Sequence, residues 1–381
     1  MQITTFLILV CPVEAVLIRR TEDKQQTKIL PDMKNKIVIA SAFVAASSLA
    51  TAEIIINDFL SFEGFVDMSY SHTDNDVSGS TDSDNSFGVD QVEINWLFNF
   101  DKVSGVIDFA YTGSDASDTP VGSGDETQLE QAYVTYSLED GTAITAGRFE
   151  SMLGFEAFEP TGLYQYSLAY DFSFLPGYSE GVKYTYESSD FFFGASLLSS
   201  YDNTVGRLGG SNRALSNDPN DALDSDYAVE LAASYLLDNI TFFLGGYYTD
   251  VNSNEADNDG SITAMNAYVT YETGTWLFAG ELNAGNNEQG ATDTDLYSGL
   301  LMANYAYSEV ASVTGRVSYE SSDADTLELS QTKLTLAHGY AFTDNLFLVT
   351  EVSVVDGEID TAGVETDSES LAGAVELIFA F

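Results

Sequence analysis

The sequence has few residues of several types, and each scarcity excludes a class of protein. Its single cysteine, Cys11, provides neither a disulfide framework nor a cysteine-based metal site. Only 13 lysines and arginines stand against 60 aspartates and glutamates, so the formal charge is −47 and binding to nucleic-acid phosphates is not expected. After Ala52 no apolar stretch reaches the ~18 residues that a membrane-spanning helix needs.

Residues for acid–base catalysis are scarce as well. The two histidines, His72 and His338, lie outside any G-x-S-x-G or H-E-x-x-H motif. We therefore expect no catalytic residue, no metal centre and no cofactor, and the chain is predicted not to be an enzyme. The acidic segments 74–76 and 252–260 are expected to be solvated external surface, with loosely bound Ca²⁺ as the alternative.

The N-terminal region carries a targeting signal. From Met33 the chain has two lysines, an apolar stretch over 37–49 and an A-x-A site at 50–52, which together predict a secretory signal peptide over 33–52. Residues 1–32 precede this signal and are interpreted as an over-extended upstream segment. The mature protein is then residues 53–381.

The mature chain is rich in aromatic residues and alternates apolar and polar positions in sixteen segments. In the segments 60–70, 227–237 and 276–284, every second residue is uncharged, whereas the positions between them include acids. A charge that faces lipid at the bilayer midplane costs about 2–4 kcal/mol, which explains the exclusion. The pattern predicts an all-β fold. A soluble sandwich would alternate in the same way, and the connections between the segments favour a 16-stranded antiparallel transmembrane β-barrel.

The connections between these segments alternate between short and long. Short connections carry tight-turn residues, as in Glu139-Asp140-Gly141 and Asp238-Asn239. Long connections are predicted over 72–86, 113–126, 149–179, 202–224, 250–260, 285–294, 320–325 and 356–368. This asymmetry is typical of barrels with short periplasmic turns and long external loops.

Three motifs resemble the OmpL-like family of Gram-negative outer-membrane porins. They are the segments 129–136 (LEQAYVTY), 145–149 (TAGRF) and 153–156 (LGFE), and the terminal Phe381 adds to the likeness. The resemblance implies a homotrimer in the outer membrane, in contact with outer-membrane lipid and lipopolysaccharide. It also implies that the last strand, through Phe379 and Phe381, is recognised by the barrel-assembly machinery.

The predicted connection 149–179 differs in composition from the other long connections. Those are rich in Asp, Asn, Ser and Gly, whereas this one carries aromatic side chains that should not stand in water: Phe155, Phe158, Tyr164, Tyr166, Tyr170, Phe172 and Phe174. We predict that it folds into the lumen as a constriction, as the third loop of porins does. The alternative is a loop packed over the rim or between subunits.

Charged residues of this loop and of the wall beside it are the candidate pore constriction. They are Arg148, Glu150, Glu156, Glu159, Asp171, Lys183, Arg316 and Lys333. Rings of charge set ion preference in pores, and inward acids outnumber inward bases, so weak cation selectivity is predicted. The alternative is that each base only pairs with a neighbouring acid.

The predicted function is passive diffusion of ions and small hydrophilic solutes through a water-filled pore. One alternative is a channel specific for a sugar or another small organic solute, with Tyr164, Tyr166 and Phe172 as a track for that solute. The other alternative is a structural or adhesive surface barrel, which would not conduct ions.

Overall fold

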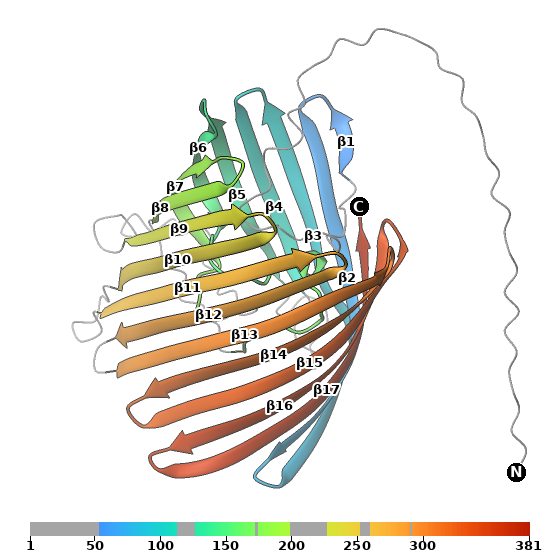
Figure 1. The fold of residues 1–381 in the computed structure, drawn as a ribbon, viewed down its shortest axis with the longest axis vertical. Coiled ribbons are helices and arrows are strands. Elements are labelled where there is room, and N and C mark those ends of the chain that lie inside the picture. Colours follow the sequence, from blue (N-terminus) through green and yellow to red (C-terminus); the bar gives the residue numbers. More distant parts are fainter. Residues whose placement is uncertain (1–52, 113–125, 172–173, 199–226, 252–259, 290–291) are drawn as a thin grey trace, which may run out of the picture. The chain divides into compact units, whose positions relative to one another are not determined.

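A computed structural model describes residues 53–112, 126–171, 174–198, 227–251, 260–289 and 292–381, and most of them are strand (Figure 1). The strands are β1 (Ile54–Asn57), β2 (Leu60–Val77), β3 (Ser80–Phe100), β4 (Val103–Thr112), β5 (Glu126–Ser137), β6 (Thr142–Glu150), β7 (Tyr178–Glu187), β8 (Phe191–Leu198), β9 (Ala228–Leu237), β10 (Ile240–Val251), β11 (Gly260–Thr273), β12 (Trp276–Gln289), β13 (Thr292–Ser308), β14 (Ala311–Ala324), β15 (Leu327–Thr343), β16 (Leu346–Thr361) and β17 (Val364–Ala380). One short 3-10 helix, η1, covers Pro160–Gly162. No helix among these residues is long and apolar enough to cross a membrane. The predicted upstream segment 1–32 and signal peptide 33–52 lie outside the described residues.

The strands β2 to β17 form a closed ring. Each pairs antiparallel with the next, and β17 pairs back with β2. The C-terminal residue joins this seam, because Phe381 donates its N–H to the oxygen of Gly64 at 2.8 Å and accepts the N–H of Gly64 at 2.7 Å. Closure leaves no free sheet edge, which lipid requires. The predicted 16-stranded antiparallel β-barrel is confirmed; the short β1 only adds a hairpin to the start of β2.

Alternate side chains separate cleanly between the two faces of the wall. On β9, Leu231 is 50% exposed, whereas the adjacent Glu230 is 1% exposed. On β12, Leu282 is 72% exposed and Glu281 is 3% exposed. The apolar face is therefore the outer, lipid-facing one, and the acids point inward.

The predicted short turns lie at one end of the barrel. Asp101, Asp140 and Asp238 take positive φ angles of 55°, 61° and 55° in these turns, a conformation that a short polar side chain tolerates better than most residues do. The chain can then reverse within two to four residues. The pairing begins at Phe100 and Val103 for β3 and β4, at Ser137 and Ala143 for β5 and β6, and at Leu237 and Ile240 for β9 and β10.

At the opposite end of the barrel, four of the predicted long loops are wrong, because the structure has mostly strand there. The segments 72–86, 320–325 and 356–368 are mostly strand, joined by the two-residue turns 78–79, 325–326 and 362–363. The segment 285–294 is strand up to Gln289 and again from Thr292. The polar residues there continue the ladder through cross-strand hydrogen bonds. The predicted loops over 113–126, 202–224 and 250–260 lie almost entirely outside the described residues.

Candidate functional site

The segment between β6 and β7, residues 151–177, contacts inward-facing side chains of distant strands. Its first part runs along β9 to β12. The Ser151 hydroxyl and the Met152 N–H both donate to Oε1 of Glu230, at 2.5 and 2.8 Å. The Phe155 N–H donates to Oε1 of Glu281 at 2.8 Å. Carboxylates of the wall thus satisfy backbone donors of a segment that is not strand in the part that the structure describes.

The second part of the segment is held by β14 and β16. Ser167 donates its N–H and its hydroxyl to the two carboxylate oxygens of Glu351, at 3.0 and 2.6 Å. The Asp171 N–H donates to Oε1 of Glu320 at 2.8 Å. The segment therefore lies on the inner side of the wall and reaches strands far from its own ends.

A buried ion pair joins the segment to the wall. Arg316 Nη1 on β14 lies 2.5 Å from Oε1 of Glu156, and the two side chains are 0% and 4% exposed. Oε2 of Glu156 accepts the Ala169 N–H at 2.8 Å, and Nη2 of Arg316 donates to the Leu168 oxygen at 3.0 Å. A buried pair with such additional hydrogen bonds costs much to break, because one buried charge then loses its partner.

Two of the other predicted bases also touch the loop or its ends. Lys333 Nζ on β15 donates to the Leu168 oxygen at 2.9 Å and lies 3.7 Å from Oδ1 of Asp171. Lys183 Nζ lies 4.3 Å from the ring centre of Phe149 and donates to the backbone oxygen of Glu150 at 3.4 Å. Lys333 thus contacts the segment itself, and Lys183 contacts the end of β6 that leads into it.

The remaining predicted residues lie near the start of β7. Arg148 Nε donates to the Glu130 backbone oxygen at 3.0 Å, and its guanidinium carbon lies 5.8 Å from the Tyr178 ring centre. The Tyr178 hydroxyl donates to Oε1 of Glu159 at 3.0 Å. Arg148 and Glu159 therefore both contact one tyrosine, Arg148 at its ring and Glu159 at its hydroxyl.

Most of the predicted loop aromatics pack into the wall. Tyr164 is 8% exposed and clusters with Leu277, Leu300 and Met302, with Phe155 against them. Phe158 lies 5.4 Å from Tyr178 between ring centres, and Phe174 packs on the cluster of β8 to β10. Phe172 lies outside the described residues.

Two tyrosines of the loop instead present their hydroxyls to the wall. The Tyr166 hydroxyl lies 3.2 Å from that of Ser69 on β2. The Tyr170 hydroxyl donates to Oε2 of Glu281 at 3.0 Å. Burial, followed by the Glu281 carboxylate, raises the pKa of Tyr170 well above its ordinary value, so this hydroxyl remains a donor.

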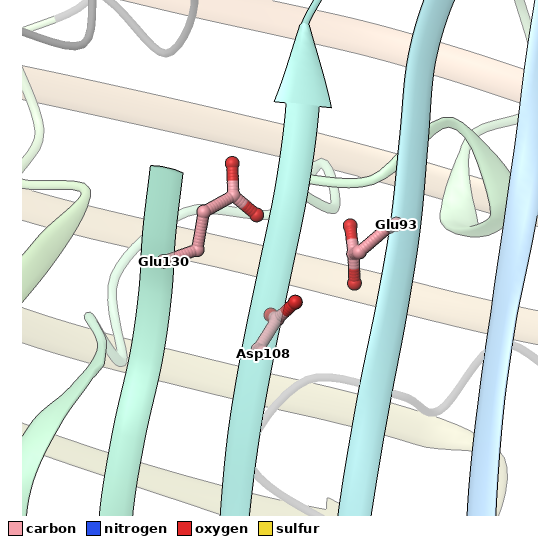
Figure 2. Close-up of side chains that lie close together, drawn as sticks. All are labelled: Glu93, Asp108 and Glu130. Carbon is pink, nitrogen blue, oxygen red and sulfur yellow. The ribbon is translucent and has the colours of Figure 1, made fainter. Parts of the chain in front are cut away.

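A group of acids that the sequence analysis did not assign to the site lies on neighbouring strands. Glu93 on β3, Asp108 on β4 and Glu130 on β5 have carboxylate oxygens within 4.8 Å of one another, and Figure 2 shows the three side chains converging. Glu93 and Asp108 occupy inward positions of their strands. Glu130 is the residue that the ladder between β4 and β5 skips at a β-bulge, and its carboxylate lies beside the other two. Their donor atoms could hold a metal ion.

The C-terminal aromatics predicted to guide assembly lie at the seam of the barrel. Phe379 is 43% exposed, and its ring centre lies 5.6 Å from that of Phe381. Phe381 in turn meets Phe62 edge-on at 6.3 Å. Their recognition by the assembly machinery stays a prediction.

Comparison with known families supports this architecture. The family model described as "Putative beta-barrel porin-2, OmpL-like" matches residues 60–381. The chain belongs to this family. It is an outer-membrane porin of the Gram-negative type, with the closed barrel expected of that location. A comparison with curated proteins finds no similar sequence.

Solved structures of outer-membrane proteins share the fold of this porin. An anion-selective porin from Comamonas acidovorans is 12% identical with a TM-score of 0.60, over 84% of this chain and 99% of that one. The outer membrane channel DcaP of Acinetobacter baumannii is 13% identical with a TM-score of 0.59, over 84% and 97%. OmpT of Vibrio cholerae is 13% identical with a TM-score of 0.58, over 86% and 100%. At these identities the likeness extends to the fold alone.

Proposed function

We propose that this porin is a pore for passive diffusion of ions and small hydrophilic solutes, weakly selective for cations, with residues 151–177 as its constriction. The tethers of this segment support the constriction, because inward side chains of β9, β12, β14 and β16 hold it against the inner wall. A segment held in this way narrows the lumen. Solutes would then be selected by size and by charge at this level.

The charge of the buried inner residues carries the selectivity argument. Among the described residues nine buried acids face two buried bases, Arg316 and Lys333; the acids are Asp67, Glu93, Asp108, Glu156, Glu230, Glu281, Glu320, Glu351 and Glu376. Both bases are engaged by the loop. The resulting field favours cations.

Reversal potentials in a planar bilayer under a KCl gradient test this proposal. We expect a potential of the sign given by K⁺ preference, and a clear Cl⁻ preference would contradict it. The double variant Asp67→Asn/Glu376→Gln should move the potential toward zero. The matched control is Asp360→Asn/Glu365→Gln at an exposed end of the barrel, where bulk salt screens the charge; it should leave the potential nearly unchanged.

A channel specific for a sugar is less well supported. The rings expected to form a track are engaged elsewhere, since Tyr164 is buried in the wall cluster and Tyr166 contacts Ser69. Saturable block of single channels by one solute would nevertheless favour that alternative. Absence of any conductance would favour a structural or adhesive barrel.

The proposed assembly is a homotrimer in contact with outer-membrane lipid and lipopolysaccharide. One solved structure of OmpT from Vibrio cholerae, which shares the barrel fold, is described as a trimer form. Its chain is 12% identical to this one, with a TM-score of 0.56. Three equal conductance steps per insertion event, together with the mass of the detergent-solubilised particle, would test this number of subunits.

A further inference from the structure

Glu93, Asp108 and Glu130 form a compact carboxylate cluster inside the barrel (Figure 2). Their strands are adjacent, and the ladder places Asn95 opposite Asp108 and Asp108 opposite Gln131. Glu93 and Asp108 are 1% and 0% exposed, so water does not screen the pair as it would at the surface. Buried carboxylates at this spacing are unfavourable unless bound protons or a bound cation neutralise them.

The cluster retains oxygens that no protein group satisfies. Gln91 and Asn95 donate to the two oxygens of Glu93, at 3.1 and 2.8 Å, and Gln131 donates to Oδ2 of Asp108 at 3.3 Å. Oδ1 of Asp108 and Oε2 of Glu130 are buried and accept no hydrogen bond. Buried polar atoms almost always have a partner, so the wholly buried Asp108 carboxylate points to a ligand that supplies one.

The charges around the cluster do not balance among the described residues. Glu159 of the loop lies close enough to act on all three carboxylates, which adds a fourth acid. Arg148 is the base that acts on Glu130, and its Nε donates to the backbone oxygen of that residue. One guanidinium stands beside four carboxyl groups, so bound protons or a bound cation must balance the remaining carboxylates.

We propose that Glu93, Asp108 and Glu130 bind a divalent cation, with Ca²⁺ preferred over Mg²⁺. The donors are all carboxylate oxygens, the hard ligands that both ions take, but Ca²⁺ accepts irregular geometry and sheds water more readily. A buried cluster on three strands offers irregular geometry and little room for the waters that Mg²⁺ keeps. The site differs from the external loops where loosely bound Ca²⁺ was expected, and it does not require that the pore conduct.

Calorimetric titration of Ca²⁺ into the detergent-folded protein tests the site. The wild type should show one strong site per chain, and Glu93→Gln/Asp108→Asn should weaken it by about tenfold or more, because two charged ligands are lost. The matched control is Asp293→Asn/Asp295→Asn, which removes two exposed acids that bind Asn286. It should retain the strong site, and Mg²⁺ should bind the wild type more weakly than Ca²⁺.

Several outcomes would overturn the proposal. Equal Ca²⁺ isotherms for the wild type and Glu93→Gln/Asp108→Asn would show that any strong site lies outside this cluster. Loss of Ca²⁺ binding in the control Asp293→Asn/Asp295→Asn would assign the site to exposed acids. Mg²⁺ binding as tight as Ca²⁺ binding would contradict the preference. If the double variant does not fold, Glu130→Gln replaces it. Ca²⁺ should then raise the unfolding temperature of the wild type more than that of this variant, and equal shifts would contradict the site.

Discussion

The barrel wall has two unequal parts. The strands β12 to β17 are 14 to 17 residues long, whereas β4 to β9 are 8 to 12 residues long. The short-strand part contributes the segment 151–177, which leaves the wall after β6. The long-strand part holds that segment through Glu281, Arg316 and Glu351. One part of the wall thus supplies the inner loop and the other anchors it.

Residues that extend beyond the lipid-facing band are arranged differently in the two parts of the wall. In the long-strand part polar residues continue the ladder, as Asn286 does by donating to Asp293 and Asp295 across strands β12 and β13. In the short-strand part the chain turns inward, and its backbone donors are satisfied by buried carboxylates instead. Backbone N–H groups find acceptors in both arrangements. Only the inward turn of the short-strand part places residues within the lumen.

Removal of the anchor arginine should have the largest effect. Arg316→Met leaves Glu156 buried without its charge partner, which should cost about 3–5 kcal/mol and release the loop. We expect a lower unfolding temperature in detergent and a larger single-channel conductance. The double variant Arg316→Met/Glu156→Leu should recover much of the stability, since no buried charge then lacks a partner. Unchanged conductance in both variants would show that the loop does not limit the pore.

Turn glycines at the two ends of the barrel should differ in sensitivity. Gly141, with φ of +79°, closes the short turn before β6, and an added Cβ would collide with the backbone oxygen of Glu187. Gly141→Ala should therefore cost ~1–3 kcal/mol for the collision, in addition to ~1–2 kcal/mol for the backbone conformation. Thermal unfolding of the folded barrel measures this cost.

The matched substitution at the opposite end should cost less. Gly79 has φ of +82° in the two-residue turn between β2 and β3, where an added Cβ meets no atom. Gly79→Ala should cost only the ~1–2 kcal/mol of backbone strain. Equal costs at Gly79 and Gly141 would contradict the expected collision between an added Cβ at Gly141 and the Glu187 backbone.

The smallest effect is expected for the second anchor cation. Lys333 lies 3.7 Å from Asp171, whose side chain is 52% exposed, so water can replace the lysine there. The Leu168 oxygen also keeps its hydrogen bond from Arg316. Lys333→Met should therefore cost about 1 kcal/mol or less and leave the conductance close to that of the wild type, in contrast to Arg316→Met.

Local patterns were sufficient for much of the fold. Period-two alternation and turn residues such as Asp101, Asp140 and Asp238 predicted the strands, their faces and the short turns. The same reasoning is wrong for the segments 72–86 and 356–368, because runs of polar residues are not confined to loops. Beyond the lipid a strand can be polar on both faces and still pair.

The candidate site was only partly accessible from the sequence. The aromatic composition of residues 149–179 drew attention to the loop, and the alternation placed Arg316 and Lys333 on the inner face. The partners of these bases could not be derived, since Arg316 and Glu156 are 160 positions apart. The cluster of Glu93, Asp108 and Glu130 was missed because Glu130 alternates with the inward Gln131, and only the β-bulge between β4 and β5 brings its carboxylate to the other two.

The sequence by itself determined which residues face lipid and where the chain reverses, because both depend on neighbours within a few positions. Tertiary structure decided which inward side chains meet. Closure of the barrel and the register between strands bring inward side chains from distant parts of the sequence to the same level along the barrel axis. The loop then forms its hydrogen bonds with those side chains. For this reason the anchor pair and the carboxylate cluster became visible only in the folded barrel.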